Sequence, residues 1–170
     1  MTAEPTRGRA AVVVVSTQAA ADPALDRTGP VIADWLRDHG FTTSDPIIVP
    51  DGGAITETVT AELLADARVV ITTGGTGVTP TDRTPEAVAG LIDLELPGIT
   101  EEIRRRGLAG AGPTALLPRG VAGVTNAGCL LVTLPGSRGG VSDGLAVLDG
   151  VLDHVVAQVH GEGHAPRSAS

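Results

Sequence analysis

Two kinds of residue in this chain could do chemistry: a glycine-rich segment, and acids that follow apolar runs. Gly74, Gly75, Thr76 and Gly77 come after the apolar residues 68–71, which predict a buried strand. Glycines let the main chain turn sharply and approach a ligand where a Cβ would collide. The Thr-Pro-Glu-Ala sequence at 84–87 then predicts a helix start with its threonine as the cap. A strand, a glycine-rich turn and a helix N-terminus together make a site for an anion such as phosphate.

Asp82 lies inside this predicted anion site, although a carboxylate by itself repels phosphate. Its position therefore predicts that it holds a metal ion or a proton beside the anion. Asp51 follows another predicted strand, and we expect both acids at one edge of a sheet. Magnesium takes one or two carboxylates and keeps several waters, so Asp51 and Asp82 predict a magnesium–phosphate site. Two structural alternatives stay open: Asp51 could stabilise the turn at 52–53, and Asp82 could cap the helix at Thr84.

The elements that position these residues alternate along the first half of the chain. The predicted strands cover residues 12–15, 46–49 and 69–72, and the predicted helices cover residues 28–40, 55–67 and 84–92. Residues 16–27 are expected to form a loop. This alternation indicates a parallel, doubly wound sheet covered by helices.

The second half of the chain is less regular. Residues 98–107 predict a short exposed helix whose arginines 104–106 face solvent, with phosphate contact or a subunit contact as the alternative. Residues 116–122 and 129–134 predict two strands, and the short turn between them favours an antiparallel pair. A last helix is expected up to residue 159. We predict one domain at 9–160, an N-terminal tail at 1–8 and a disordered tail at 161–170.

Candidate ligand contacts follow the carboxyl ends of the predicted strands, where ligands bind in doubly wound sheets. They are Ser16, Asp26, Thr28 and Gly29 after the first strand, the glycine-rich segment after the third, and Pro135, Gly136 and Ser137 after the last. We predict that these residues bind the substrate. Ser137 could instead cap the last helix.

Composition excludes several classes of function. Every basic residue is arginine, which excludes a Walker-type phosphate loop and any Schiff-base mechanism, since both need lysine. The net charge of −8 argues against nucleic acid as a partner. No run approaches the ~18 apolar residues of a membrane span, and residues 1–9 lack the apolar part of a secretory signal. We therefore expect a cytoplasmic protein without a membrane partner, with Cys129 as a buried small hydrophobe.

The same residues resemble the molybdopterin-binding MoaB/Mog family of molybdenum-cofactor biosynthesis. The resemblance rests on four segments, at 73–77, 82, 84–87 and 134–137, and extends to 26–30, 50–52 and 119–123. It covers residues 9–160 and implies a single three-layer α/β/α domain. In this family such domains assemble as trimers, or as hexamers in the MoaB branch, so the resemblance implies a homo-oligomer.

The Mog branch of that family is molybdopterin adenylyltransferase. The resemblance thus implies an enzyme that joins the terminal phosphate of molybdopterin to the AMP of magnesium-ATP and releases pyrophosphate. It implies Asp51 and Asp82 in catalysis and Mg²⁺ handling, Gly74–Gly77 with Thr84 around the molybdopterin phosphate, and Pro135–Ser137 in a ligand-binding loop. The alternatives are a molybdopterin carrier or scaffold of the same pathway without that activity, and an unrelated nucleotide-binding module. A separate molybdate-inserting protein is the expected further partner.

Three positions depart from the family pattern. Thr81 stands where many members carry arginine, Thr28 replaces a more usual serine, and Arg138 follows Ser137 where proline is common. Without an arginine at 81, magnesium or another arginine is left to neutralise the substrates. Arg138 could restore a positive charge near phosphate.

Overall fold

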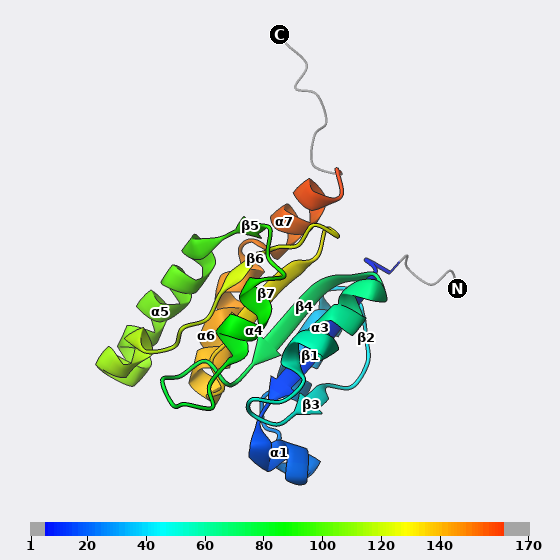
Figure 1. Cartoon of the computed structure of the whole chain (residues 1–170). Coiled ribbons are helices and arrows are strands. Elements are labelled where there is room, and N and C mark those ends of the chain that lie inside the picture. Colours follow the sequence, from blue (N-terminus) through cyan, green and yellow to red (C-terminus); the bar gives the residue numbers. More distant parts are fainter. Residues whose placement is uncertain (1–5, 162–170) are drawn as a thin grey trace.

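A computed structural model describes residues 6–161, which form one mixed sheet with helices on both faces (Figure 1). Residues 1–5 and 162–170 of the predicted tails lie outside the described residues, and the domain limits 9–160 stay a prediction. Over the described part the sheet has seven strands, in the order β2-β1-β4-β7-β6-β5, with β3 also pairing with β1. The strands are β1 (Arg9–Val15), β2 (Thr42–Thr43), β3 (Ile47–Val49), β4 (Ala67–Thr73), β5 (Leu94–Glu95), β6 (Ala122–Val124) and β7 (Leu130–Leu134).

Most of the sheet is parallel, as predicted. β1 pairs in parallel with β2, β3 and β4, and β4 pairs in parallel with β7. β6 is antiparallel to β7, and β5 is antiparallel to β6, so β6 alone runs against the other strands. The short turn between β6 and β7 leaves no room for a crossover helix, which explains the antiparallel pair.

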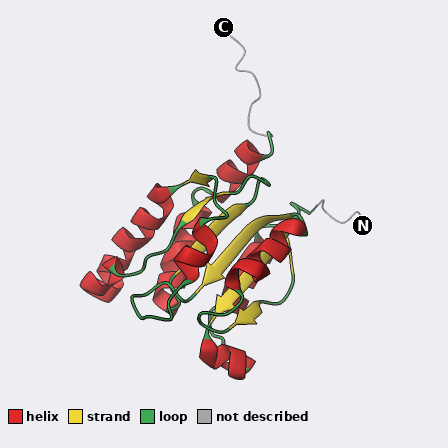
Figure 2. Ribbon diagram, in the orientation of Figure 1, coloured by secondary structure: helices red, strands yellow, loops and turns green. Residues whose placement is uncertain are grey.

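Helices cover both faces of the sheet, which confirms the three-layer architecture (Figure 2). They are α1 (Thr17–Ala21), α2 (Gly29–Asp38), α3 (Ile55–Leu64), α4 (Thr84–Ala89), α5 (Pro97–Ala111), α6 (Arg138–Asp149) and α7 (Leu152–Val159). Val12 and Val14 of β1 pack in one apolar cluster with α2, α5, α6 and α7. Val13 and Val15 pack in a second cluster with α3 and α4. Because both faces are buried, the central strands are apolar runs without alternation.

Several predicted boundaries were wrong. Residues 16–27 are not a plain loop: they hold α1 and a 3-10 turn at Pro23–Leu25, each capped by a side chain, Ser16 or Asp22. The helix expected at 84–92 ends at Ala89, and the last helix divides near Gly150 into α6 and α7.

Two further differences lie around β6. Most of the strand expected at 116–122 is absent, because Gly112–Leu116 forms a 3-10 turn and β6 begins only at Ala122. The helix expected at 98–107 is longer, Pro97–Ala111, and buries Ile99 and Ile103 against the sheet. It is therefore part of the outer layer rather than an exposed segment.

Cys129 behaves as a buried hydrophobe, as predicted. Its side chain is fully buried, and burial raises the pKa of the Cys129 thiol to about 12. Within residues 6–161, none of the helices combines the length and apolar content that crossing a membrane requires.

Candidate functional site

The parallel strands end at one level, which brings their following loops together. Val14 of β1 pairs with Thr73 of β4, and Thr73 pairs with Leu134 of β7. Figure 1 shows the arrowheads of β1 and β4 pointing to the same end of the sheet, close to α1. The predicted site residues after β1, β4 and β7 therefore share one edge, as the doubly wound arrangement requires.

Gly74 lies where three strand ends meet. Its φ is +90°, and a Cβ at this position would lie 2.2 Å from the carbonyl oxygen of Val15. Its N–H donates to the carbonyl of Leu134 over 3.2 Å. A Cβ on Gly136 would lie 3.1 Å from the Gly74 Cα. Main chain from β1, β4 and β7 thus forms the floor of the site, and only glycine fits at its centre.

Thr84 supports this floor instead of capping α4. The N-cap of α4 is Arg83, and Thr84 is the first residue of the helix. The buried Thr84 hydroxyl donates to the carbonyl of Gly74 over 2.9 Å, and its N–H donates to the carbonyl of Gly75 over 3.0 Å. Gly75 has a φ of +65°, and a Cβ there would lie 2.3 Å from the Thr84 oxygen. The predicted cap was wrong because the hydroxyl is used by the glycine turn.

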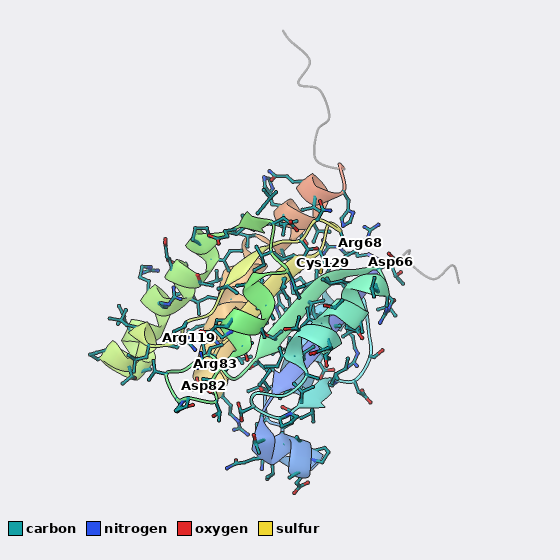
Figure 3. All side chains as sticks on the ribbon, in the orientation of Figure 1. Asp66, Arg68, Asp82, Arg83, Arg119 and Cys129 are labelled. Carbon is teal, nitrogen blue, oxygen red and sulfur yellow. The ribbon has the colours of Figure 1, made fainter. Side chains whose placement is uncertain are left out.

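Arg119 holds the rest of the glycine loop in place by hydrogen bonds. It was not predicted as a site residue. Its Nε donates to the carbonyl of Gly77 over 2.7 Å, and its Nη2 donates to the carbonyl of Asp82 over 2.8 Å. Its own N–H donates to the carbonyl of Thr76 over 2.8 Å. Figure 3 shows Arg119 and Asp82 side by side at this end of the sheet. The loop is therefore held at both ends by one side chain.

The Arg119 guanidinium also pairs with Glu86 of α4. This hydrogen bond holds the pKa of the Glu86 carboxyl below its ordinary value. The only indication in the sequence that Arg119 belongs to the site is its position in a segment that resembles the family. Its loop partners lie 42 and 37 residues earlier, at Gly77 and Asp82, and nothing local indicates that contact.

The cluster of arginines on α5 divides between two environments. Arg105 pairs with Glu102 and, like Arg106, is exposed, as the prediction of a solvated face requires. Arg104 is half-buried, and its Nε and Nη2 donate to the carbonyls of Pro118 (2.8 Å) and Gly120 (3.2 Å). The prediction was wrong for Arg104, which holds the residues on either side of Arg119.

Asp82 does not cap α4, which has no side-chain cap. Its Oδ2 accepts from the N–H of Thr79 over 3.2 Å, and the carboxylate lies over Gly77, where a Cβ would be 2.6 Å from that oxygen. The other oxygen, Oδ1, makes no hydrogen bond. Asp82 thus keeps one carboxylate oxygen free on the loop that Arg119 holds.

Asp51 joins β3 to α1 and does not bond to the turn that follows it. Its Oδ2 accepts from the N–H of Thr17 over 3.0 Å and from the Thr17 hydroxyl over 2.9 Å. The N–H of Asp51 in turn donates to that hydroxyl over 3.1 Å. Its Oδ1 is also free. Within residues 6–161, no group of three or more His, Cys, Asp or Glu could hold a metal.

Three of the remaining predicted contacts use their side chains as helix caps. Oδ1 of Asp26 accepts from the N–H groups of Thr28 (3.1 Å) and Gly29 (2.8 Å) at the start of α2. Ser16 caps α1, and Ser137 caps α6 by accepting from the N–H of Gly140 over 3.1 Å. The structural alternative for Ser137 is therefore confirmed.

Two cavities lie on either side of the loop between β7 and α6. The first has a volume of about 280 Å³ and is lined by five predicted contacts, Ser16, Asp26, Thr28, Gly74 and Gly136, together with residues that include Arg27 and Arg138. The second, of about 600 Å³, lies between α5 and α6, and Pro135 and Ser137 are among its lining residues. The predicted residues that line neither cavity are Gly29, Asp51, Gly75, Thr76, Gly77, Asp82 and Thr84.

Comparison with known proteins identifies related sequences. A profile of the family described as "Probable molybdopterin binding domain" matches residues 11–154. The chain is 39% identical over 156 residues to a "Molybdenum cofactor biosynthesis bifunctional protein" of Synechococcus elongatus. That alignment covers 91% of this chain and 48% of the relative. It is 34% identical over 150 residues to the "Molybdopterin adenylyltransferase" of Escherichia coli. That alignment covers 85% of this chain and 74% of the relative. The chain thus spans about half the length of the bifunctional relatives it matches.

Solved structures show the same architecture. The molybdopterin biosynthesis Mog protein of Mycobacterium ulcerans superposes with a TM-score of 0.83 at 42% identity, covering 93% of this chain and 99% of that one. The tungsten cofactor synthesizing protein MoaB of Pyrococcus furiosus superposes with a TM-score of 0.79 at 31% identity, covering 92% and 99%.

Proposed function

The chain belongs to the family described as probable molybdopterin binding domains, and from this we propose that it is a molybdopterin adenylyltransferase of molybdenum-cofactor biosynthesis. A relative with that name and 34% identity supports the proposal. The proposal rests on the main-chain floor around Gly74, which we call the cradle. On the neighbouring loops, Asp51 and Asp82 each keep one carboxylate oxygen without a hydrogen bond. Such a cradle suits a phosphorylated substrate.

In the proposed reaction, an oxygen of the terminal molybdopterin phosphate forms a bond to the α-phosphorus of ATP. The bond between that phosphorus and the bridging oxygen to the β-phosphate breaks, and pyrophosphate leaves with the electron pair. The nucleophile belongs to the substrate, so the protein needs only to orient two anionic groups and offset their repulsion. The glycine loop, held by Thr84 and Arg119, provides that fixed frame.

The residues present fit a magnesium ion that is shared with a substrate. Mg²⁺ takes one or two carboxylates together with waters and substrate phosphates, and Asp51 and Asp82 each offer one unbonded oxygen. When bound, the ion would neutralise phosphate charge. The hydrogen bonds from Thr17 and Thr79 fix the other oxygen of each carboxylate.

Purified protein incubated with molybdopterin and magnesium-ATP tests the proposal directly. We expect adenylyl-molybdopterin and pyrophosphate in equal amounts, measured by mass spectrometry and a pyrophosphate assay. Binding of molybdopterin without any adenylylated product would contradict the enzyme and leave the carrier or scaffold function. Omitting ATP is the matched control, because the substrate phosphate then has no α-phosphorus to attack.

A trimer, with a hexamer as the alternative, is the assembly we propose. Large apolar side chains are exposed around α5, where a subunit contact would cover them: Leu94 (67%), Leu108 (41%), Leu116 (58%) and Leu117 (52%). Sedimentation velocity tests this, and a monomer at micromolar concentration would contradict it. We propose that molybdate insertion needs a separate protein, and that this chain acts in the cytoplasm.

A further inference from the structure

Two arginines beside the smaller cavity make no ion pair with any described residue. Within the described part of the chain, Arg27, Arg106 and Arg138 donate no side-chain hydrogen bond and make no ion pair. Arg27 and Arg138 both line the cavity of about 280 Å³, whereas Arg106 lies on α5 and lines neither cavity. Two unpaired cations on one cavity leave positive charge available for an anionic ligand.

Thr28 adds a hydroxyl without a protein partner to the lining of the same cavity. Only 8% of Thr28 is exposed, and its hydroxyl makes no hydrogen bond, although its N–H is bonded to Asp26. A hydroxyl that lines a cavity and has no partner within the protein is available to hydrogen-bond a ligand there. Thr28 is also the N-cap residue of α2, which leaves the hydroxyl free because Asp26 performs the capping.

The main chain around the cavity favours negative charge as well. α2 and α6, of ten and twelve residues, both begin at its wall, with Thr28 before the first and Arg138 as the first residue of the second. Helix N-termini carry partial positive charge. The one acid among the lining residues, Asp26, has an oxygen bonded to two N–H groups of α2. Positive charge therefore exceeds negative charge at this cavity.

We infer that Arg27, Thr28 and Arg138 form a subsite for an oligophosphate, with a pyrophosphate unit as its ligand. The two arginines come from different elements, the loop before α2 and the start of α6, so each can pair with one of two linked phosphates. The assignment of that unit to the β- and γ-phosphates of ATP rests on the proposed function. Binding of pyrophosphate itself does not. A subsite of this kind holds the leaving group of the proposed reaction.

Calorimetric titration of the full chain with inorganic pyrophosphate, at low ionic strength and without molybdopterin, tests the subsite. We expect Arg27→Ala and Arg138→Ala each to weaken binding about tenfold, the loss of one charge-assisted contact. Arg106→Ala, which removes the third unpaired arginine, should leave the affinity unchanged. Thr28→Val should weaken binding several-fold without lowering the unfolding temperature, because the hydroxyl has no partner within the protein.

The same titration with inorganic phosphate shows whether the subsite binds a single phosphate or two linked phosphates. Equal affinity for phosphate and pyrophosphate would overturn the oligophosphate assignment in favour of a single phosphate, such as that of a phosphate monoester. Absence of pyrophosphate binding, or equal losses in all three arginine variants, would overturn the subsite itself. If the protein binds pyrophosphate through these residues but makes no adenylyl-molybdopterin, the subsite is supported and the proposed function is wrong. The failure of one hypothesis can therefore be distinguished from the failure of the other.

Discussion

Arg119 holds Asp82 by its main chain and not by its carboxylate. Nη2 of Arg119 donates to the Asp82 carbonyl over 2.8 Å, while the ion pair of the guanidinium is made with Glu86. The acid is thereby fixed in position without forming an ion pair with Arg119. Its free oxygen stays available for a metal ion or a proton, which is the role the sequence predicts for it.

Removing the Arg119 side chain should impair turnover. Arg119→Ala loses the bonds to the carbonyls of Gly77 and Asp82, and a misplacement of about 1 Å in a reacting group can cost on the order of a hundredfold in rate. We expect kcat to fall by that order while the fold is retained, measured by steady-state kinetics and circular dichroism. Arg105→Ala, which breaks only the exposed pair with Glu102, is the control. Equal activity of the two variants would contradict the positioning role.

Asp82→Asn should abolish turnover and leave folding and oligomeric state intact. The asparagine oxygen can still accept from the N–H of Thr79, so the loop keeps its hydrogen bond while the negative charge is lost. Product formation and sedimentation of the variant are the two measurements. If Asp82→Asn turns over at the rate of the unchanged protein, the assigned role of this acid is wrong.

Gly74→Ala should destabilise the protein strongly. The new Cβ would meet the Val15 carbonyl oxygen at 2.2 Å on a backbone with φ of +90°, so we expect a loss of about 2–4 kcal/mol in the free energy of unfolding. Urea denaturation measures it. Gly98→Ala is the matched control, because nothing lies within 4 Å of a Cβ there and the residue is helical. A small gain is expected for the control, and similar midpoints for both variants would be evidence against the crowded floor.

Cys129 should resist thiol reagents in the folded protein at pH 8. With a pKa of about 12, only about one thiol in ten thousand is ionised at that pH, and the side chain is fully buried. Labelling by a disulfide reagent should therefore be slow in buffer and fast in denaturant. Rapid stoichiometric labelling of the folded protein would show that Cys129, directly before β7, is less protected than the structure indicates.

Glu86 should titrate below its ordinary pKa of 4.5, since the hydrogen bond from Arg119 favours the carboxylate. A group whose pKa is lower in the folded state contributes stability above its unfolded pKa, and this contribution is lost as pH falls through the folded pKa. The difference in unfolding midpoint between the unchanged protein and Glu86→Gln should therefore be present at pH 7 and disappear in acid. A difference that grows as the pH falls would have the wrong sign.

The parts of the fold that could be predicted are those with a local signal. β1 and β4 are buried on both faces, and β3 is partly buried, so all three appear as apolar runs in the sequence. β2 and β5 were missed because two residues are too few to make a pattern. The division of the last helix was missed because α6 and α7 pack on the same apolar cluster, so the stripe of apolar residues continues across Gly150.

The site was predicted where it follows strand ends and missed where it depends on distant contacts. Ser16, Thr28, Gly74 and Gly136 were expected together and line one cavity. Thr84 was expected to cap a helix, because its hydrogen bond to Gly74 depends on a turn that no sequence pattern specifies. Asp51 and Asp82 as ligands of one magnesium stay a prediction.

The floor of the cradle is main chain from three strand ends, with glycines at 74 and 136 and no side chain on its surface there. Thr84 and Arg119 hold this main chain in place, and the exposed side chains of Arg27 and Arg138 make no hydrogen bond to it. The charges of Arg27 and Arg138, which line the smaller cavity, can therefore be exchanged without rebuilding the sheet. A scaffold of this kind lends itself to engineering, because the preference for one phosphorylated molecule over another can be altered by surface substitutions alone.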